Sequence, residues 1–459
     1  MDSKSPEGNF PMVEVTINNE EKMRVLNGLI ADVVKSKKKQ WVPGQDWVQY
    51  AGSYIDENEY IAVMECLLGG WLVLGENGFK FEREFRSLLG KQHGALTNSG
   101  SSANLLMVSA LKSKRLYGFK PGTKIITPVA GFPTTINPII QNGFEPVFID
   151  IEIDTLNLNI EQLEEAAKSG AKALIFAHVL GNPPNMDRVM EIVKKYDLVL
   201  LEDCCDALGS KYDGKPLGSF GQFASCSFYP AHHITMGEGG FVACATDEQN
   251  TVVKSLREWG RGCYCYGAAS SCLKNGMCKR RFSNWLPSLP DEVFDHKYVY
   301  DEIGYNLKPI DLQAAMGLIQ LKKLDKIIEM RKRNYSLLLQ IFSKYEEYFH
   351  LPKATEKADP SWFAFPLTVR DGAPFKRKDF TMFLENNKIQ TRNYFAGNIL
   401  LQPGYSEVAP GIDAKTKFPV ATKVTIDTFF LGTSPVITEE QISYIGTIVD
   451  SFFGSLQHA

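Results

Sequence analysis

The 459-residue sequence lacks a long apolar run and lacks a strong excess of either charge. No stretch approaches the roughly 20 apolar residues of a membrane-spanning helix, so we expect no membrane insertion. With 50 basic against 53 acidic residues, the net charge of -3 gives no reason to expect a nucleic-acid partner. The opening residues, MDSKSPEGNFPM, lack the continuous apolar segment of a signal peptide. These absences predict a cytoplasmic protein.

The sequence also lacks the context in which cysteines form disulfides. Nine cysteines in a chain expected to be cytoplasmic are not expected to make a disulfide framework, so they must serve core packing, metal ligation or catalysis. The spacing of the cysteines and the residues beside them must show which of these uses applies to each cysteine.

Short β-rich segments alternate with longer helical patterns between about residues 95 and 250. This rhythm predicts an α/β domain around a mostly parallel, buried sheet. The expected strands are 124–129, 145–151, 172–181, 198–205, 224–230 and 241–245.

The length favours a large domain with a smaller one beside it. We predict a helical lead-in over 1–69, a large domain over 70–324 and a C-terminal α+β domain over 325–459. Residues 262–300 are rich in Cys, Gly, Ser, Pro and aromatics. A stretch of this length without a regular pattern indicates a functional loop.

Two segments suit the parts of a phosphate-bearing ligand. Small residues at 99–102 precede an apolar helix, whose exposed N–H groups are suited to a phosphate, although such residues also simply cap helices. Asp203 ends an expected buried strand, where a carboxylate needs a partner. A protonated pyridine nitrogen at about 4 Å would supply roughly 4 kcal/mol before desolvation is subtracted.

Four short motifs in order, SGS at 99–101, ED at 202–203, SFYP at 227–230 and GEGG at 237–240, make the chain similar to the DegT/DnrJ/EryC1/StrS family of sugar aminotransferases. The resemblance implies the aspartate-aminotransferase fold (type I fold of pyridoxal-phosphate-dependent transferases), a pyridoxal or pyridoxamine phosphate cofactor and a homodimer. In that family a lysine that binds the cofactor covalently follows SFYP after one residue. Here His232 holds that position, and no lysine occurs between Lys215 and Lys254.

The resemblance also assigns roles residue by residue. It implies that His232, Tyr229 and Asp206 form the catalytic set, since a histidine can move protons but cannot form a stable imine. His233 is expected to point away from the site if the backbone is extended there, and His178 lies near the site or serves the structure. The cofactor-binding set is Ser101, Ser102, Phe132, Asp203, Ser227 and Asn306, with Asn306 reaching the cofactor phosphate of the other subunit.

Cysteines narrow the resemblance to the lysine-less 3-dehydrase branch of the family, which combines pyridoxamine phosphate with a [2Fe–2S] cluster. The implied ligands are Cys205, Cys263, Cys265 and Cys278. Cys278 precedes a basic run as the last ligand of that branch does, whereas Cys272 is closer to the expected spacing. A zinc site made of Cys263, Cys265, Cys272 and Cys278 remains an alternative. For Cys66, Cys204, Cys226 and Cys244 we expect plain burial.

The branch implies removal of the C3 hydroxyl from a nucleotide-linked 4-keto-6-deoxyhexose, with CDP favoured as the nucleotide, in the biosynthesis of 3,6-dideoxyhexoses of lipopolysaccharide O-antigen. It also implies a ferredoxin-like flavin/iron–sulfur NAD(P)H reductase as electron donor. Arg257, Arg261, Lys279, Arg280 and Arg281 surround the cysteine loop and suit an acidic partner. Arg392, Asn393 and Asn398 suit a diphosphate and sugar hydroxyls. The rival hypotheses are a cluster-free lysine-less dehydrase and a non-catalytic cofactor-binding protein.

Overall fold

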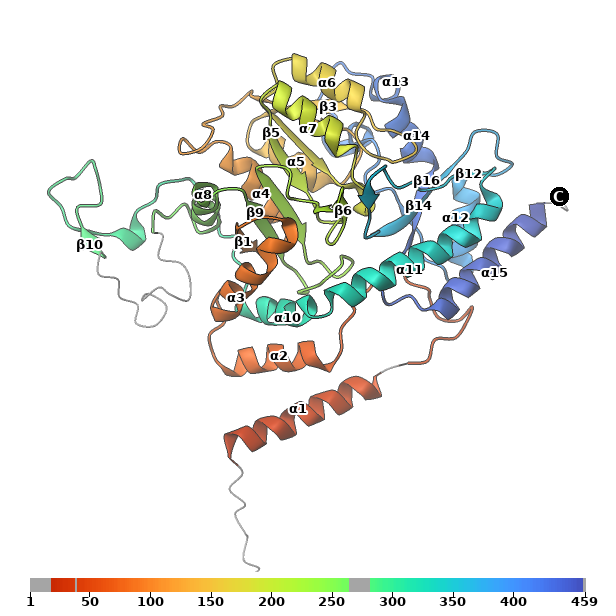
Figure 1. Ribbon diagram of the computed structural model, residues 1–459, viewed down its shortest axis with the longest axis horizontal. Helices are drawn as coiled ribbons and strands as arrows, with labels where there is room; N and C mark the ends of the chain where they lie inside the picture. Colours follow the sequence, from red (N-terminus) through yellow and green to blue (C-terminus); the bar gives the residue numbers. More distant parts are fainter. Residues whose placement is uncertain (1–17, 38, 264–280, 457–459) are drawn as a thin grey trace, which may run out of the picture.

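A sheet of seven strands forms the centre of the computed structural model, which describes residues 18–37, 39–263 and 281–456 (Figure 1). The strand order is β1-β9-β8-β5-β4-β2-β3, and only β9 runs antiparallel to its neighbours. The bounds are β1 His93–Thr97, β2 Lys124–Pro128, β3 Glu145–Ile149, β4 Ala173–Ala177, β5 Val199–Asp203, β8 Phe223–Ser227 and β9 Gly240–Cys244. Each of the six strands expected from the sequence is present, and the mostly parallel α/β sheet is confirmed.

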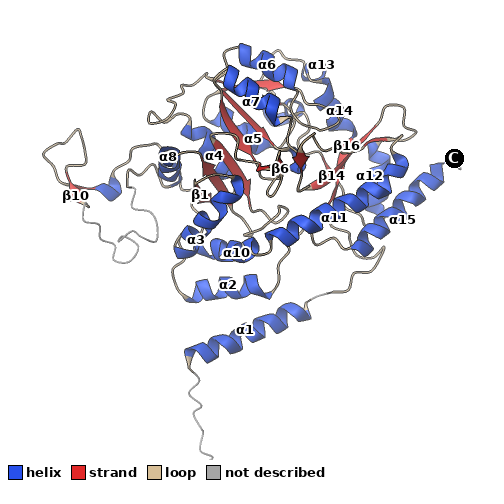
Figure 2. Ribbon diagram, in the orientation of Figure 1, coloured by secondary structure: helices blue, strands red, loops and turns tan. Residues whose placement is uncertain are grey.

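Helices cover both faces of this sheet because its strands are apolar on both sides. Successive residues of one strand, Ile175 and Phe176 for example, belong to core clusters on opposite faces. One face packs against α3 (Glu76–Phe85), α6 (Ile160–Lys168), α7 (Met186–Lys195) and α10 (Asp311–Leu321), and the other packs against α4 (Gly100–Ala110), α5 (Pro133–Gln141) and α8 (Asp247–Arg257). The layered arrangement is visible in Figure 2.

A second, antiparallel sheet lies in the C-terminal part of the chain, in the order β12-β14-β16-β15. Its strands are β12 Phe349–His350, β14 Ala364–Val369, β15 Arg392–Asn393 and β16 Thr428–Gly432. Helices α11 (Leu324–Phe342), α12 (Arg377–Asn386) and α15 (Glu439–Leu456) enclose a core rich in phenylalanine with it. Shorter helices α13 (Ala414–Lys417) and α14 (Pro419–Asp427) complete this part.

The helical segment around residue 324, expected to bridge the two parts, consists of two helices. Helix α10 ends at Leu321 and α11 begins at Leu324, with Lys323 between them anchored on the buried carboxylate of Glu59. That glutamate belongs to α2 (Glu57–Leu68), which packs on α10 and also contacts α1 (Asn19–Ser36). The domain boundaries at residues 69/70 and 324/325 stay a prediction.

Two small sheets lie outside the main layers. Strands β6 (Lys211–Tyr212) and β7 (Lys215–Pro216) join β13 (Ala358–Asp359), and β10 (Phe282–Ser283) pairs with β11 (Phe294–Asp295). The β10–β11 arm projects from the body of the molecule (Figure 1). Within the described residues, no helix is long and apolar enough to cross a membrane.

Candidate active site

A cavity of about 1060 Å³ opens where several parallel strands end. Its walls include the carboxyl ends of β2, β4, β5 and β8, the region where ligands bind in open α/β sheets. The C-terminal part contributes Phe363 and residues 392–396. The volume reaches the upper end of the usual range for small-molecule sites, which leaves room for a cofactor and a second ligand.

One end of the cavity is formed by the start of helix α4. Ser99 caps this helix by accepting a hydrogen bond from the Ser102 N–H at 3.1 Å, and its hydroxyl donates to the Ser102 hydroxyl at 3.0 Å. The first-turn N–H groups of Gly100 and Ser101 have no carbonyl to bond within the helix. Ser101 lines the cavity and donates to the Thr134 hydroxyl, whereas Ser102 lies behind it, in the cap.

Only glycine fits at position 100. A Cβ there would lie 2.5 Å from the Ser227 Cβ and 2.9 Å from its hydroxyl oxygen. The missing side chain therefore lets Ser227 approach the start of α4 closely, so that its hydroxyl and the bare first-turn N–H groups border the same part of the cavity. This combination fits a phosphate group.

Asp203, at the end of β5, is held in one orientation by four donors. Its Oδ2 accepts from Asn104 and from Thr135, both at 2.7 Å, while Oδ1 accepts from the Cys205 N–H at 3.1 Å and faces the Ser225 hydroxyl at 3.3 Å. The residue is 5% exposed and lines the cavity. A carboxylate fixed in this way fits the protonated ring nitrogen of a pyridine cofactor.

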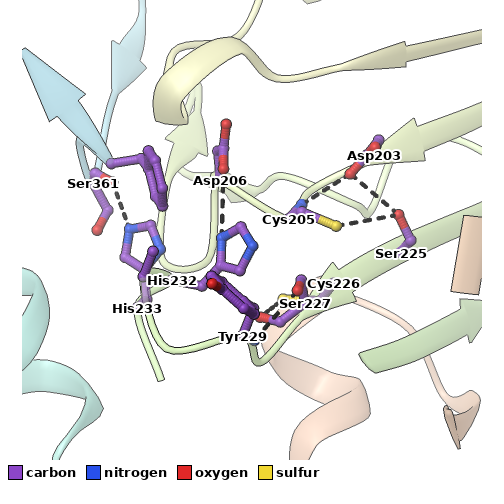
Figure 3. Close-up of polar contacts among 12 residues, drawn as sticks. Asp203, Cys205, Asp206, Ser225, Cys226, Ser227, Tyr229, His232, His233 and Ser361 are labelled. Atoms are coloured by element: carbon purple, nitrogen blue, oxygen red, sulfur yellow. Dashed lines mark hydrogen bonds and ion pairs between the residues drawn. The ribbon is translucent and has the colours of Figure 1, made fainter. Parts of the chain in front are cut away.

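His232 faces Asp206 across the cavity wall (Figure 3). The distance between Nδ1 and Oδ1 is 3.4 Å, an ion-pair distance without the alignment of a good hydrogen bond. Burial raises the pKa of Asp206 above its usual range, although His232 opposes that rise. The ring of Tyr229 lies edge-on to the imidazole at 6.4 Å. The structure thus brings the three predicted catalytic side chains together in one wall.

Aromatic residues also line the cavity. Phe132, immediately before α5, is 51% exposed and meets Phe395 edge-to-face at 5.9 Å. Phe395 has φ of 41°, a strained conformation for a bulky residue. Arg392 and Asn393 line the cavity as well, but Asn398 is fully buried and donates to the Ala414 carbonyl. The prediction that Asn398 contacts substrate is therefore wrong: its amide holds the backbone.

Cys205 lies inside this cavity. It lies beside Ser225 and close to Gly100, and Figure 3 shows its sulfur pointing toward Ser225. Burial, and after it the charge of Asp203, raise the pKa of the Cys205 thiol well above its usual range. Cys263 is 8% exposed, whereas Cys265, Cys272 and Cys278 fall outside the described residues.

A backbone path connects the cavity with Cys263. The Asn98 N–H, at the cavity wall, donates to the Leu307 carbonyl at 2.9 Å, and the Leu307 N–H donates to the Arg257 carbonyl at 3.0 Å. Arg261, which pairs with Tyr300, lies four residues after Arg257 and two residues before Cys263. Backbone hydrogen bonds thus join the cavity wall to the segment that leads to Cys263.

The other cysteines are mostly core residues. Cys204, Cys226 and Cys244 are fully buried, as expected. Cys66 differs, because it is partly exposed and its thiol lies 3.8 Å from the Asp311 carboxylate that anchors the start of α3.

Several other sequence-based expectations are settled by burial. His178 is fully buried and pairs with Glu202 at 3.0 Å, so its role is structural. His233 does point away from the cavity, but residues 230–236 form turns and bends, not a strand. Asn306 is exposed, accepts from Lys308 and does not line the cavity of its own chain.

The expected cluster of docking cations is also smaller than the sequence indicated. Arg257 has no exposed surface and pairs with Glu82 at 2.8 Å and Glu258 at 3.0 Å, so the prediction that it docks a partner is wrong. Arg281 pairs with Asp295 at 2.7 Å. Lys279 and Arg280 lie outside the described residues.

Comparisons with known proteins agree with this geometry. The model of the DegT/DnrJ/EryC1/StrS aminotransferase family matches residues 53–450. Lipopolysaccharide biosynthesis protein RfbH of Salmonella typhimurium is 43% identical over 418 residues, which are 91% of this chain and 94% of RfbH. The dTDP-4-dehydro-2,6-dideoxy-D-glucose 3-dehydratase of Saccharopolyspora spinosa is 41% identical over 415 residues, 90% of this chain and 88% of that enzyme.

Solved structures show the same fold. The E. coli GDP-4-keto-6-deoxy-D-mannose-3-dehydratase with bound hydrated PLP has a TM-score of 0.74 and 27% identity, covering 88% of this chain and 99% of that one. A histidine-to-asparagine variant of GDP-4-keto-6-deoxymannose-3-dehydratase with bound GDP-perosamine has a TM-score of 0.75 and 28% identity, covering 88% of this chain and all of that one. The predicted type I fold is thereby confirmed, and the chain belongs to the DegT/DnrJ/EryC1/StrS aminotransferase family.

Proposed function

We propose that this protein is a pyridoxamine-phosphate-dependent 3-dehydrase, which removes the C3 hydroxyl of a nucleotide-linked 4-keto-6-deoxyhexose. One observation carries the proposal. The cavity is lined by residues suited to a vitamin B6 phosphate, but it has His232, beside Asp206, at the position of the family's lysine. The two 3-dehydratases among the relatives and solved structures compared above support it.

The cavity fits the cofactor on three sides. The start of α4 at Gly100, with the Ser101 and Ser227 hydroxyls beside it, suits the phosphate. Asp203 suits the ring nitrogen, and Phe132 offers a face for the ring. We assign Ser102 to the support of the phosphate-binding end of the cavity. We assign Asn306 to contact with the cofactor phosphate of a second copy in a homodimer.

Bound pyridoxamine phosphate would supply an amine for the 4-keto carbon and a ring that takes up the electrons released at its methylene carbon. The chain itself must move protons at that carbon. His232 is the residue we assign to this task, because imidazole accepts and returns protons near neutral pH. We assign to Asp206 the task of holding the imidazole ring, and to Tyr229, which is 48% exposed, that of donating a proton to the departing hydroxyl.

A histidine in place of lysine also explains why dehydration would prevail over amine transfer. A lysine amine can displace the sugar from the cofactor, which releases an amino sugar. Imidazole cannot form that covalent bond, so the sugar stays attached long enough to lose its C3 hydroxyl. The nucleotide is expected near Arg392 and Asn393 at the cavity mouth. CDP remains the favoured nucleotide, although two relatives are named for dTDP- and GDP-linked sugars.

We further propose that Cys205, Cys263, Cys265 and Cys278 hold a [2Fe–2S] cluster. Dehydration leaves an unsaturated sugar that needs two electrons and two protons to become the 3-deoxy product. A flavin/iron–sulfur NAD(P)H reductase would supply the electrons one at a time through the cluster. The backbone path from the cavity to Cys263 supports this placement, and metal binding would overcome the raised pKa of the Cys205 thiol.

A second candidate is a dehydrase without a cluster. A solved structure of GDP-4-keto-6-deoxymannose-3-dehydratase contains a trapped PLP-glutamate geminal diamine, and its chain is 28% identical to this one with a TM-score of 0.75. An enzyme of that kind would recycle its cofactor with glutamate. A single assay separates the candidates, since consumption of glutamate without added reductase favours the second and reductase dependence favours the first.

Oxygen exchange tests the dehydrase itself. Protein incubated with pyridoxamine phosphate, a CDP-linked 4-keto-6-deoxyhexose and ¹⁸O-water, without reductase, should place ¹⁸O at sugar carbon 3 through reversible loss of the hydroxyl. dTDP- and GDP-linked substrates, run in parallel, identify the nucleotide. Absence of label at carbon 3 with all three substrates would overturn the proposal.

A further inference from the structure

The segment that carries His232 has little regular structure of its own. Between the end of β8 at Ser227 and the start of β9 at Gly240, the backbone runs through turns and bends. Carbonyl groups in such a segment need donors from elsewhere, and the position of the imidazole depends on where those donors lie. Most of this segment is nevertheless buried.

Arg331 supplies donors to this segment from a distant part of the chain. Its side chain rises from the middle of α11 and has no exposed surface. Nη2 donates to the Ala231 carbonyl at 2.9 Å and to the His232 carbonyl at 3.0 Å, while Nη1 donates to the Phe363 carbonyl at 3.0 Å. One guanidinium therefore ties the backbone of His232 to the segment that enters β14.

That segment also contacts the histidine rings directly. The Phe363 ring packs on the His232 imidazole, with centroids 5.3 Å apart. The neighbouring His233 ring donates from Nε2 to the Ser361 carbonyl at 2.6 Å, as Figure 3 shows. Burial, aided by the charge of Arg331, lowers the pKa of His233 well below its usual range, so this ring stays neutral. Phe363 thus packs on the His232 ring and Ser361 binds the neighbouring His233 ring, while Arg331 binds the His232 carbonyl.

Arg331 lacks the partner that usually stabilises a buried cation. Among the described residues no carboxylate lies within ion-pair distance of it; its guanidinium contacts three carbonyl oxygens and lies over the Phe363 ring at 5.6 Å. Burial lowers the pKa of Arg331, and the charge of Asp206, which lies beyond ion-pair distance, opposes this only in part, so the buried cation is costly for stability. A methionine or leucine would fill the same space without that cost, so the charge and its fork of donors serve a purpose other than packing.

We propose that Arg331 is a positioning residue for His232: it fixes the backbone of the Ala231–His232 turn so that the imidazole faces both Asp206 and the cavity. This inference rests on the proposed function of His232. The planar guanidinium matters, because one side chain must point at three carbonyls in fixed directions. A lysine ammonium keeps the charge but cannot reproduce that fork.

Arg331→Lys and Arg331→Met test the proposal. Arg333→Lys is the matched control: it lies two positions away on the same helix, but its side chain is 37% exposed and pairs with Glu439 at 3.1 Å. For each protein we would measure pyridoxamine phosphate affinity, and the rate at which deuterium leaves the methylene carbon of the bound cofactor in the presence of substrate. We would also record the NMR signal of the His232 ring in cofactor-free protein.

In Arg331→Lys, deuterium release should slow about tenfold or more, since small misplacements of a reacting group carry penalties of that order. Cofactor affinity should stay within about twofold, because Gly100, Asp203 and Phe132 are untouched. The His232 signal should shift or broaden, and Arg333→Lys should match wild type in every measurement. Arg331→Met should be slower than Arg331→Lys.

Two kinetic results would each overturn the proposal: deuterium release within about twofold of wild type in Arg331→Lys, or a loss of release that only parallels a loss of cofactor binding. If neither Arg331 variant folds, Arg331→Gln applies the same comparison, because its amide keeps one donor for a carbonyl but loses the charge and the fork of donors. If wild type itself releases no deuterium, the proposed function fails, while an unchanged His232 signal in Arg331→Lys would separately refute the positioning role.

Discussion

The Nδ1 atom of His232 lies 3.4 Å from Oδ1 of Asp206, and both side chains are mostly buried in the wall of the cavity. The carboxylate lies on the Nδ1 side of the ring, which leaves Nε2 as the nitrogen for proton exchange with a ligand. A carboxylate behind an imidazole orients the ring and stabilises its protonated form. The dyad joins two loops, one after β5 and one after β8.

Asp206→Asn should therefore slow catalysis without emptying the site. We expect kcat to fall about tenfold to a hundredfold, because the imidazolium loses its counter-charge. Cofactor affinity should change little, since Asp203 and the start of α4 are untouched. Asp154→Asn is a matched control, as Asp154 faces His350 at 3.8 Å in an exposed pair. Steady-state kinetics and cofactor titration check both variants; an unchanged kcat in Asp206→Asn would contradict the role.

Gly100→Ala should weaken cofactor binding. The added methyl group would lie 2.5 Å from the Ser227 Cβ, so the start of α4 or Ser227 must move away from the phosphate position. A loss of about tenfold or more in affinity is expected, equivalent to about 1.4 kcal/mol. Gly454→Ala, where a Cβ meets nothing within 4 Å, is the control. Absorbance titration with pyridoxamine phosphate measures both, and equal affinities would argue against a phosphate at Gly100.

Cys263→Ser should remove the iron. The wild-type protein, purified without oxygen, is expected to be brown and to hold about two irons per chain. Cys66→Ser should retain both irons, because Cys66 lies beside Asp311 and is outside the proposed ligand set. Iron analysis and visible absorption measure this. Colourless, iron-free wild-type protein would remove the cluster from the account and favour the cluster-free dehydrase.

The buried pair of Glu202 and His178 predicts a pH-dependent stability. Burial alone would raise the pKa of Glu202, but His178, the Gly221 N–H and Lys91 outweigh it and hold the pKa below its usual range. The resulting stability is full above the unfolded-state pKa of about 4.3 and is lost as the pH falls through the lower native value. Glu202→Gln should thus cost about 3 kcal/mol in unfolding free energy at pH 7.

The difference between Glu202→Gln and wild type should shrink below about pH 4, where the wild-type carboxylate becomes protonated. Denaturant unfolding across pH 3 to 8 measures this difference. Glu164→Gln, which removes one partner of a surface pair with Lys195, should leave the free energy of unfolding close to that of wild type at every pH, because water screens such pairs. A constant penalty for Glu202→Gln down to pH 3 would show that the pair does not control acid stability.

The sequence could predict the parts of the site that are local. Asp203 stood out because it ends a buried strand, and Ser101 because small residues precede an apolar helix; both line the cavity. The missing lysine could be recognised from the SFYP motif alone, because His232 follows that motif after one residue. Each of these signals lies within a few residues of the group it identifies.

What the sequence could not show depends on contacts between distant segments. Thr135 and Asn104 orient Asp203 from two different helices, and Arg331 reaches the His232 carbonyl from another helix of the chain. Arg257 looked like a surface cation because it lies near the cysteine loop, yet Glu82 pairs with it in the core. A composition pattern contains no information on which distant carboxylate or carbonyl meets a given side chain.

The most direct test of the central claim compares wild type with His232→Gln, using pyridoxamine phosphate deuterated at its methylene carbon. With substrate present, wild type should release deuterium to water, and His232→Gln should release it about a hundredfold or more slowly while binding the cofactor equally well. Equal release rates in the two proteins would contradict the assignment of His232 as the proton-transfer residue.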